Sequence, residues 1–110
     1  MAREAGTVRW ADPGLLILGS LAGGAKHGYA IVGDVESTSG VVLGPGTLYG
    51  ALARLEEHGL VEALPGQDRR RPYRLTAAGS AVLADQVQSM TRFARVGRRR
   101  LQAMVAGGRA

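Results

Sequence analysis

Cysteine is absent from the 110-residue sequence. This absence excludes disulfide bonds, thiolate nucleophiles and thiolate metal sites, and it favours a cytosolic over a secreted setting for a folded domain this small. Long apolar runs are also lacking, because the stretch Leu15–Leu18 is far shorter than the ~20 residues of a membrane span. No small-residue cleavage site follows a basic start, so we expect a cytoplasmic protein that is neither exported nor inserted into a membrane.

Lysine is almost missing as well, since Lys26 is the one lysine among 14 basic residues. Nine acidic residues leave a formal net charge of +5, which favours a polyanionic partner. With 45% hydrophobic and 21% charged residues, the composition is that of an ordinary globular domain. A chain of this length can bury one core but not two. We therefore expect a single folded domain with an anionic partner.

The chain is predicted to begin with a loose segment followed by a buried helix. Residues 1–10 show no hydrophobic period and are interpreted as a flexible N-terminal arm. Asp12 followed by Pro13 is typical of a helix N-cap and first helical position. The residues that follow are apolar on nearly all sides, which predicts a central helix through Leu21.

Two further short helices are expected before the middle of the chain. The first runs from about Tyr29 to Glu36 and is followed by a turn over residues 37–40. The second begins at Gly44-Pro45-Gly46 and ends at His58-Gly59, where glycine can take the left-handed conformation. Its predicted buried stripe consists of Leu48, Leu52 and Leu55. The residues expected to project from its opposite side are Thr47, Gly50 and Arg54.

A two-stranded hairpin is predicted next. Residues 60–64 and 71–75 are the two extended runs, and Pro65-Gly66-Gln67-Asp68 is the turn between them. Arg69, Arg70 and Arg71 lie at or beside its tip. Three consecutive arginines repel one another, and binding to DNA phosphates or to the minor groove explains their position; a solvated charge run is the alternative.

The last predicted element is a long helix capped by Thr76, over residues 77–106, with residues 107–110 as a disordered tail. Its apolar residues recur at alternating steps of four and three, which is a heptad seam. The three-helix domain is too small to cover this seam, so we expect a homodimer; packing against the first helix is the alternative for part of it. The predicted interface residues are Val82, Leu83, Val87, Met90, Phe93, Leu101 and Met104.

The end of this helix is rich in arginine. After Asp85 no acidic residue occurs, whereas Arg92, Arg95, Arg98, Arg99, Arg100 and Arg109 do. Three interpretations stay open: pairing with acids of a second subunit, contact with flanking phosphates, or plain solvation.

The order of three helices, charged hairpin and long helix is that of a winged helix-turn-helix, and the sequence resembles the PadR family of bacterial transcription regulators. The stretches that carry the resemblance are Leu16–Leu21, His27–Ile31, Pro45–Leu60 and Arg71–Gly79. The resemblance implies a mainly α fold with a small β-hairpin wing, in which residues 11–76 form the DNA-binding domain and residues 77–106 form the dimerisation helix. It further implies a homodimeric repressor on a roughly palindromic operator in double-stranded DNA. Relatives commonly respond to small aromatic or drug-like molecules, and Trp10, Met90 and Phe93 are candidates to line such an effector site.

Ten residues are predicted to contact DNA. Small or hydrogen-bonding groups at the start of the third helix, Gly46, Thr47 and Gly50, allow close approach to the major groove. Tyr49 and Arg54 can reach phosphates, although Tyr49 is equally suited to a half-buried packing role and Gly46 to a cap. Contacts from His27 and Tyr29 are implied by the resemblance, with capping as the alternative for His27. Arg69, Arg70 and Arg71 complete the set.

The sequence contains no motif for catalysis or metal binding. His27 and His58 are the only histidines and lie at opposite ends of the helix-turn-helix, without carboxylates at ligand spacing. The sequence has no serine in a nucleophile elbow and no Gly-rich phosphate loop. The adjacent carboxylates Glu56 and Glu57 point about 100° apart on a helix, so they cannot act on one substrate together. We expect no enzyme activity, no cofactor and no metal. Two rival functions remain: a winged-helix module that binds an acidic protein, and a small-molecule carrier.

Overall fold

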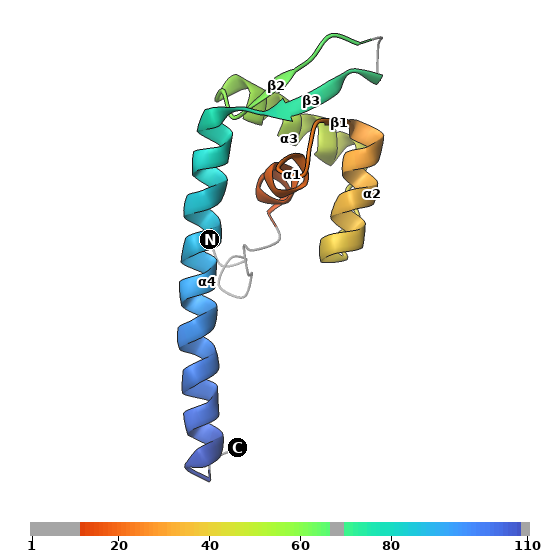
Figure 1. The fold of residues 1–110 in the computed structure, drawn as a ribbon. Coiled ribbons are helices and arrows are strands. Elements are labelled where there is room, and N and C mark those ends of the chain that lie inside the picture. Colours follow the sequence, from red (N-terminus) through yellow and green to blue (C-terminus); the bar gives the residue numbers. More distant parts are fainter. Residues whose placement is uncertain (1–11, 67–69, 109–110) are drawn as a thin grey trace, which may run out of the picture.

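The computed structural model describes residues 12–66 and 70–108, and it shows three short helices beneath a small sheet, with a long helix along one side (Figure 1). Helix α1 lies between α2 and α4, and the sheet covers one end of the three short helices (Figure 1). The elements in chain order are α1 (Pro13–Leu21), β1 (Lys26–His27), α2 (Gly28–Ser39), α3 (Pro45–Glu57), β2 (Val61–Ala63), β3 (Pro72–Leu75) and α4 (Ala77–Ala106). The predicted mainly α fold with a small β wing is confirmed.

Helix α1 forms where the sequence predicts it. The Asp12 carboxylate accepts a hydrogen bond from the Leu15 backbone N–H at 3.1 Å, and Pro13 occupies the first turn, where no backbone donor is needed. Ile17 is fully buried between the other helices, as its position on an all-apolar helix predicts. The largest fully buried side chains of the core are Ile17, Ile31, Val35, Leu52 and Val61.

The second helix is longer than predicted. It continues to Ser39 and ends at Gly40 in the left-handed conformation (φ 80°), so the expected turn over residues 37–40 is wrong. Thr38 and Ser39 disfavour helix interiors because their hydroxyls compete for backbone groups. Here the Ser39 hydroxyl donates to the Val35 carbonyl at 2.7 Å, within the helix itself, so the competing group is satisfied without breaking the helix.

The sheet has three strands rather than the two of the predicted hairpin. Strand β3 pairs antiparallel with β2 on one side and with β1 on the other, giving the order β1-β3-β2. The missed strand, Lys26–His27, is two residues long, so it carries no alternation to detect in the sequence. Its partner, Pro72–Tyr73, lies far along the chain.

The junction between α3, the sheet and α4 is fixed by backbone contacts. Gly59 has φ 74° and closes the end of α3, where the Leu60 N–H donates to the Leu55 carbonyl at 2.9 Å. The Thr76 hydroxyl donates to the Gly59 carbonyl at 2.6 Å and accepts from the Gly79 N–H at 3.0 Å. Gly79 lies so close that a Cβ there would be 2.0 Å from the Leu60 carbonyl oxygen. These contacts set the direction in which α4 leaves the domain.

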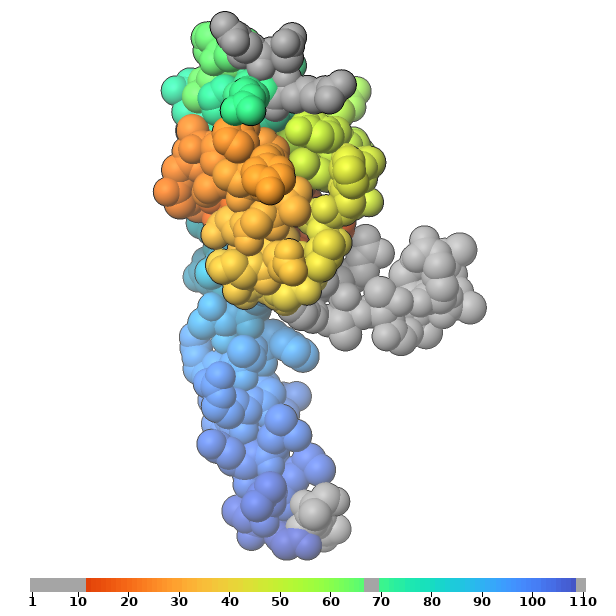
Figure 2. Space-filling model, turned by 90° about the vertical axis from the view of Figure 1, so that its right-hand side faces the viewer, coloured from red at the N-terminus to blue at the C-terminus, as the bar shows by residue number. Residues whose placement is uncertain are grey.

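Helix α4 has 30 residues and is therefore about 45 Å long at 1.5 Å per residue. Gly79 is buried and Leu83 is half-buried against the core, but the helix is exposed along most of its length beyond them. Its far half extends well past the three short helices and the sheet (Figure 2). The whole molecule, including α4, measures 60 × 28 × 28 Å. None of the helices in the described ranges has the length and hydropathy that a bilayer-spanning segment requires.

Candidate nucleic-acid interface

One side of α3 is open to solvent. Thr47 and Arg54 are exposed, and Gly50 between them is half-buried, while Leu48, Leu52 and Leu55 face the core as predicted. A Cβ at Gly46 or Gly50 would meet no atom within 4 Å, so nothing in the described chain occupies the space in front of this side. Helices α2 and α3 lie next to each other on one face, with the wing above them (Figure 2). The α3 side is therefore accessible to a rigid partner such as duplex DNA.

A shallow depression of about 340 Å³ lies beside α3 and gathers residues from four parts of the chain. His27 comes from β1, Tyr29 from the first turn of α2, Tyr49 from α3 and Arg70 from the wing. The Tyr29 ring is 86% exposed. An aromatic residue this exposed at a helix start, next to an arginine, has the amphipathic character of groups that hydrogen-bond phosphate oxygens. All four lining residues are among the predicted DNA contacts.

Tyr49 combines the two roles that the sequence leaves open. Its side chain is 41% exposed and lines the depression. Its hydroxyl oxygen also lies against Gly28, where a Cβ would approach it to 2.6 Å. Glycine at position 28 thus lets the tyrosine pack against the start of α2 while keeping part of its ring in solvent.

His27 is the N-cap residue of α2, but its side chain makes no capping hydrogen bond. His27 therefore occupies the N-cap position that the capping alternative gives it, without a side-chain hydrogen bond. The first N–H groups of α2 gain no hydrogen bond from this side chain, and such groups at a helix start favour anions.

The wing carries the predicted arginines. Arg70 and Arg71 are exposed, and Arg69 lies outside the described residues. Arg74, farther along β3, forms an ion pair with Glu62 on β2, directly opposite in the register. Its charge is therefore partly neutralised, unlike the charges of Arg70 and Arg71, for which the described chain supplies no ion-pair partner.

The predicted seam of α4 divides into two parts. Leu83 packs against the core and Val82 faces a pocket next to α1, so the intramolecular alternative accounts for the first turns. The remaining predicted interface residues are exposed, among them Phe93 at 79% and Leu101 at 63%. The exposed set is Val87, Met90, Phe93, Leu101 and Met104.

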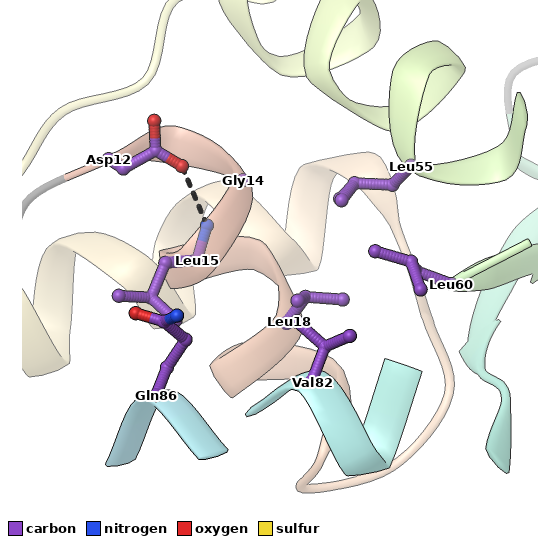
Figure 3. Close-up of a pocket in the computed structure, with 8 residues that line it drawn as sticks. All are labelled: Asp12, Gly14, Leu15, Leu18, Leu55, Leu60, Val82 and Gln86. Atoms are coloured by element: carbon purple, nitrogen blue, oxygen red, sulfur yellow. Dashed lines mark hydrogen bonds between the residues drawn. The ribbon is translucent and has the colours of Figure 1, made fainter. Parts of the chain in front are cut away.

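The pocket next to α1 has a volume of about 360 Å³ and is formed by α1, the end of α3, Leu60 and α4 (Figure 3). Four of its eight lining residues are leucines, and Asp12 and Gln86 are polar groups at one side (Figure 3). Of the residues predicted to bind an effector, Met90 and Phe93 do not line it, because they lie farther along α4. The third, Trp10, lies outside the described residues. No sequence signal marks this pocket, since its walls come from four elements that meet only on folding.

Residues 17–85, from α1 to the start of α4, match the family model described as the transcriptional regulator PadR-like family. The chain belongs to the PadR-like family. Members of this family are transcriptional regulators rather than enzymes.

Two solved structures resemble most of this arrangement. A PadR family transcription regulator from Clostridium difficile R20291 is 30% identical, with a TM-score of 0.71 over 81% of this chain and 97% of that one. RosR of H. salinarum is 27% identical, with a TM-score of 0.68 over 96% of both chains, a coverage that extends into the far half of α4.

A curated relative is much longer. An uncharacterized 37.1 kDa protein in transposon TN4556 of Streptomyces fradiae is 49% identical over 86 residues. That match covers 78% of this chain and 25% of the relative, so the chain spans about a quarter of its length.

Proposed function

We propose that this PadR-like regulator is a homodimeric repressor that binds a roughly palindromic operator. The observation that carries the proposal is the depression in which His27, Tyr29, Tyr49 and Arg70 meet beside the open side of α3. These residues are distant in sequence, and their convergence on one surface supports a shared ligand. The depression lies between α3 and the wing. When α3 lies in the major groove, the adjacent DNA backbone can therefore contact the residues of the depression.

In this proposal α3 enters the major groove. Gly46 and Gly50 let the helix backbone approach the bases, and the Thr47 hydroxyl is placed to hydrogen-bond a base edge. Arg54 and Tyr49 contact phosphates, His27 and Tyr29 hold the backbone at the start of α2, and the wing arginines Arg69, Arg70 and Arg71 bind the adjacent phosphates or minor groove. Few side chains reach the bases, so DNA shape contributes to specificity.

The dimer forms through the exposed part of the α4 seam, while residues 11–76 act as the DNA-binding domain. Five large apolar side chains on one helix need a partner surface, and a second copy of the helix supplies a matching one. A two-fold dimer presents two α3 helices about 34 Å apart, which is one turn of DNA.

We also propose that a small aromatic or drug-like effector regulates this dimer. The pocket shown in Figure 3 supports this part of the proposal, because it adjoins both the DNA-binding helices and the base of α4. Occupation of this pocket changes how α4 sits against α1 and therefore the spacing of the two α3 helices. Trp10, Met90 and Phe93 remain the alternative effector contacts.

The test is a titration of a labelled duplex from the upstream region of the protein's own gene, with unrelated duplex as competitor. Tight binding that resists the competitor is expected, and Thr47→Val weakens it by removing one hydroxyl from the α3 side. The matched control is Thr38→Val, since the Thr38 hydroxyl donates to the Asp34 carbonyl at 2.9 Å within α2. Equal binding to both duplexes at about 10⁻⁴ to 10⁻⁶ M, the nonspecific range, would favour the protein-interaction module instead.

A further inference from the structure

The positive charge of the chain is concentrated at one end. Residues 1–85 contain eight basic and nine acidic residues and so have a net charge of −1, whereas residues 86–110 contain six arginines, no acidic residue and a net charge of +6. The winged-helix part therefore has no net positive charge, and any attraction that it has for a polyanion is confined to local groups such as Arg70 and Arg71. The net positive charge of the chain lies on the far half of α4 and the residues after it.

Three of these arginines form one continuous face. Arg92, Arg95 and Arg99 are spaced by three and four residues, so their side chains project from one side of the helix. Arg92 is nine residues, or two and a half turns, before Leu101, which puts it on the side opposite the seam. All three are exposed, and none is paired within the part of the chain that the structure describes. We call Arg92, Arg95 and Arg99 the outer arginine face.

Dimerisation does not neutralise this face. A partner helix packed on the seam lies on the opposite side of α4 from the three guanidinium groups. The acid on α4 nearest to them, Asp85, lies two turns before Arg92 and on the same outer side, so the corresponding aspartate of a second copy also points away from the interface. Arg98 and Arg100 flank the seam and are the ones available to a partner subunit.

The outer arginine face also points away from the operator-binding surface. Leu83 packs against the core, so the seam side of α4 faces the domain, and helices α1 to α3 all lie on that side (Figure 1). A duplex held by α3 and the wing therefore cannot reach Arg92, Arg95 and Arg99 without leaving its own site.

We propose that the outer arginine face binds the phosphates of a second segment of double-stranded DNA, without sequence preference. The seven-residue step from Arg92 to Arg99 spans about 10 Å of helix, over which a DNA strand rises by roughly three nucleotides. The arginine fork binds phosphate in bidentate geometry, so three guanidinium groups match about three phosphates. The inference uses the family's DNA binding but does not depend on a specific operator.

The experiment uses the full chain bound to an immobilised random-sequence duplex and measures capture of a second, fluorescent duplex. The variant Arg92→Gln/Arg95→Gln/Arg99→Gln is expected to lose capture at least tenfold, because glutamine keeps helix propensity but removes the charge. The slope of log affinity against log salt for random duplex should become less negative by about 2 to 3, at 0.9 per phosphate. The matched control, Arg92→Lys/Arg95→Lys/Arg99→Lys, keeps the charge and should retain capture.

Capture by the glutamine variant at the wild-type level would overturn the proposal. Binding of wild type to phosphatidylserine vesicles without capture of a second duplex would also overturn it, in favour of a membrane partner. Circular dichroism and the mass of the dimer check that the exposed substitutions leave the fold intact. Discrimination between operator and unrelated duplex is measured separately, with Thr47→Val, so failure of the operator proposal is distinguishable from failure of this one.

Discussion

At the scale of single residues, two glycines allow close contacts that position neighbouring elements. Gly28 lets Tyr49 pack on the start of α2, and Gly79 lets α4 begin against the Leu60 carbonyl. In both positions a side chain would occupy space already filled, so the requirement is close approach rather than backbone conformation.

Replacing Gly79 with alanine is expected to destabilise the protein by about 3 kcal/mol or more, because the new Cβ overlaps a backbone oxygen that cannot move aside. Urea unfolding measures the effect. Gly33→Ala is the control: it lies in α2, where a Cβ meets nothing within 4 Å, and it should gain about 0.5 to 1 kcal/mol. Equal stabilities for the two variants would contradict the described junction.

Removal of the wing charges tests the second group of residues. Arg70→Ala/Arg71→Ala is expected to weaken operator binding and to make the salt slope less negative by about 2, one for each phosphate contact. Arg74→Ala is the matched control on the same hairpin, since its charge is paired with Glu62, and it should change the slope less. Fluorescence anisotropy at several salt concentrations gives all three slopes. A larger effect at Arg74 would argue against the assignment to the wing tip.

At the scale of elements, α4 has two sides with different chemistry. Its first turns belong to the core of the domain, and its far half carries an apolar seam on one side and arginines on the other. One helix can therefore join the domain, a second copy and an anionic ligand at the same time.

Two charges placed on the seam should produce a monomer. Val87→Glu/Leu101→Glu puts carboxylates at side chains that are 50% and 63% exposed, so the fold is retained while the helix pair is lost. Sedimentation equilibrium distinguishes the two masses. The control Gln88→Glu/Gln102→Glu adds the same charge outside the seam and should remain dimeric. A monomeric wild type would refute the dimer outright.

At the scale of the whole molecule, the proposed dimer binds its operator only if the distance between its two α3 helices matches the half-sites. Because both helices must meet the same side of the duplex, five base pairs inserted between the half-sites turn one of them half a helical turn away. The affinity should fall at least tenfold, and electrophoretic mobility shifts measure this loss. The monomeric seam variant, which engages one half-site, should be insensitive to the insertion.

Much of the local structure follows from the sequence. The Asp12 and Thr76 caps, the Leu48 stripe of α3 and the glycine stop at Gly59 are contacts between residues at most a few positions apart, so a pattern in the chain is sufficient to predict them. The end of α2 differs from the prediction because Thr38 and Ser39 usually disfavour helix interiors, where their hydroxyls compete for backbone groups. In α2 these hydroxyls donate to the Asp34 and Val35 carbonyls of the same helix, so the helix continues.

The surface itself depends on the tertiary structure. The sequence by itself determined the helix order, the family resemblance, ten candidate DNA contacts and the unequal charge of the two ends. Only folding decided that β1 joins the sheet, that His27, Tyr29, Tyr49 and Arg70 line one depression, and that the side of α4 opposite Arg92, Arg95 and Arg99 packs on the domain. Each of these outcomes depends on packing between segments distant in the chain, and the period of a single helix or strand carries no information about such packing.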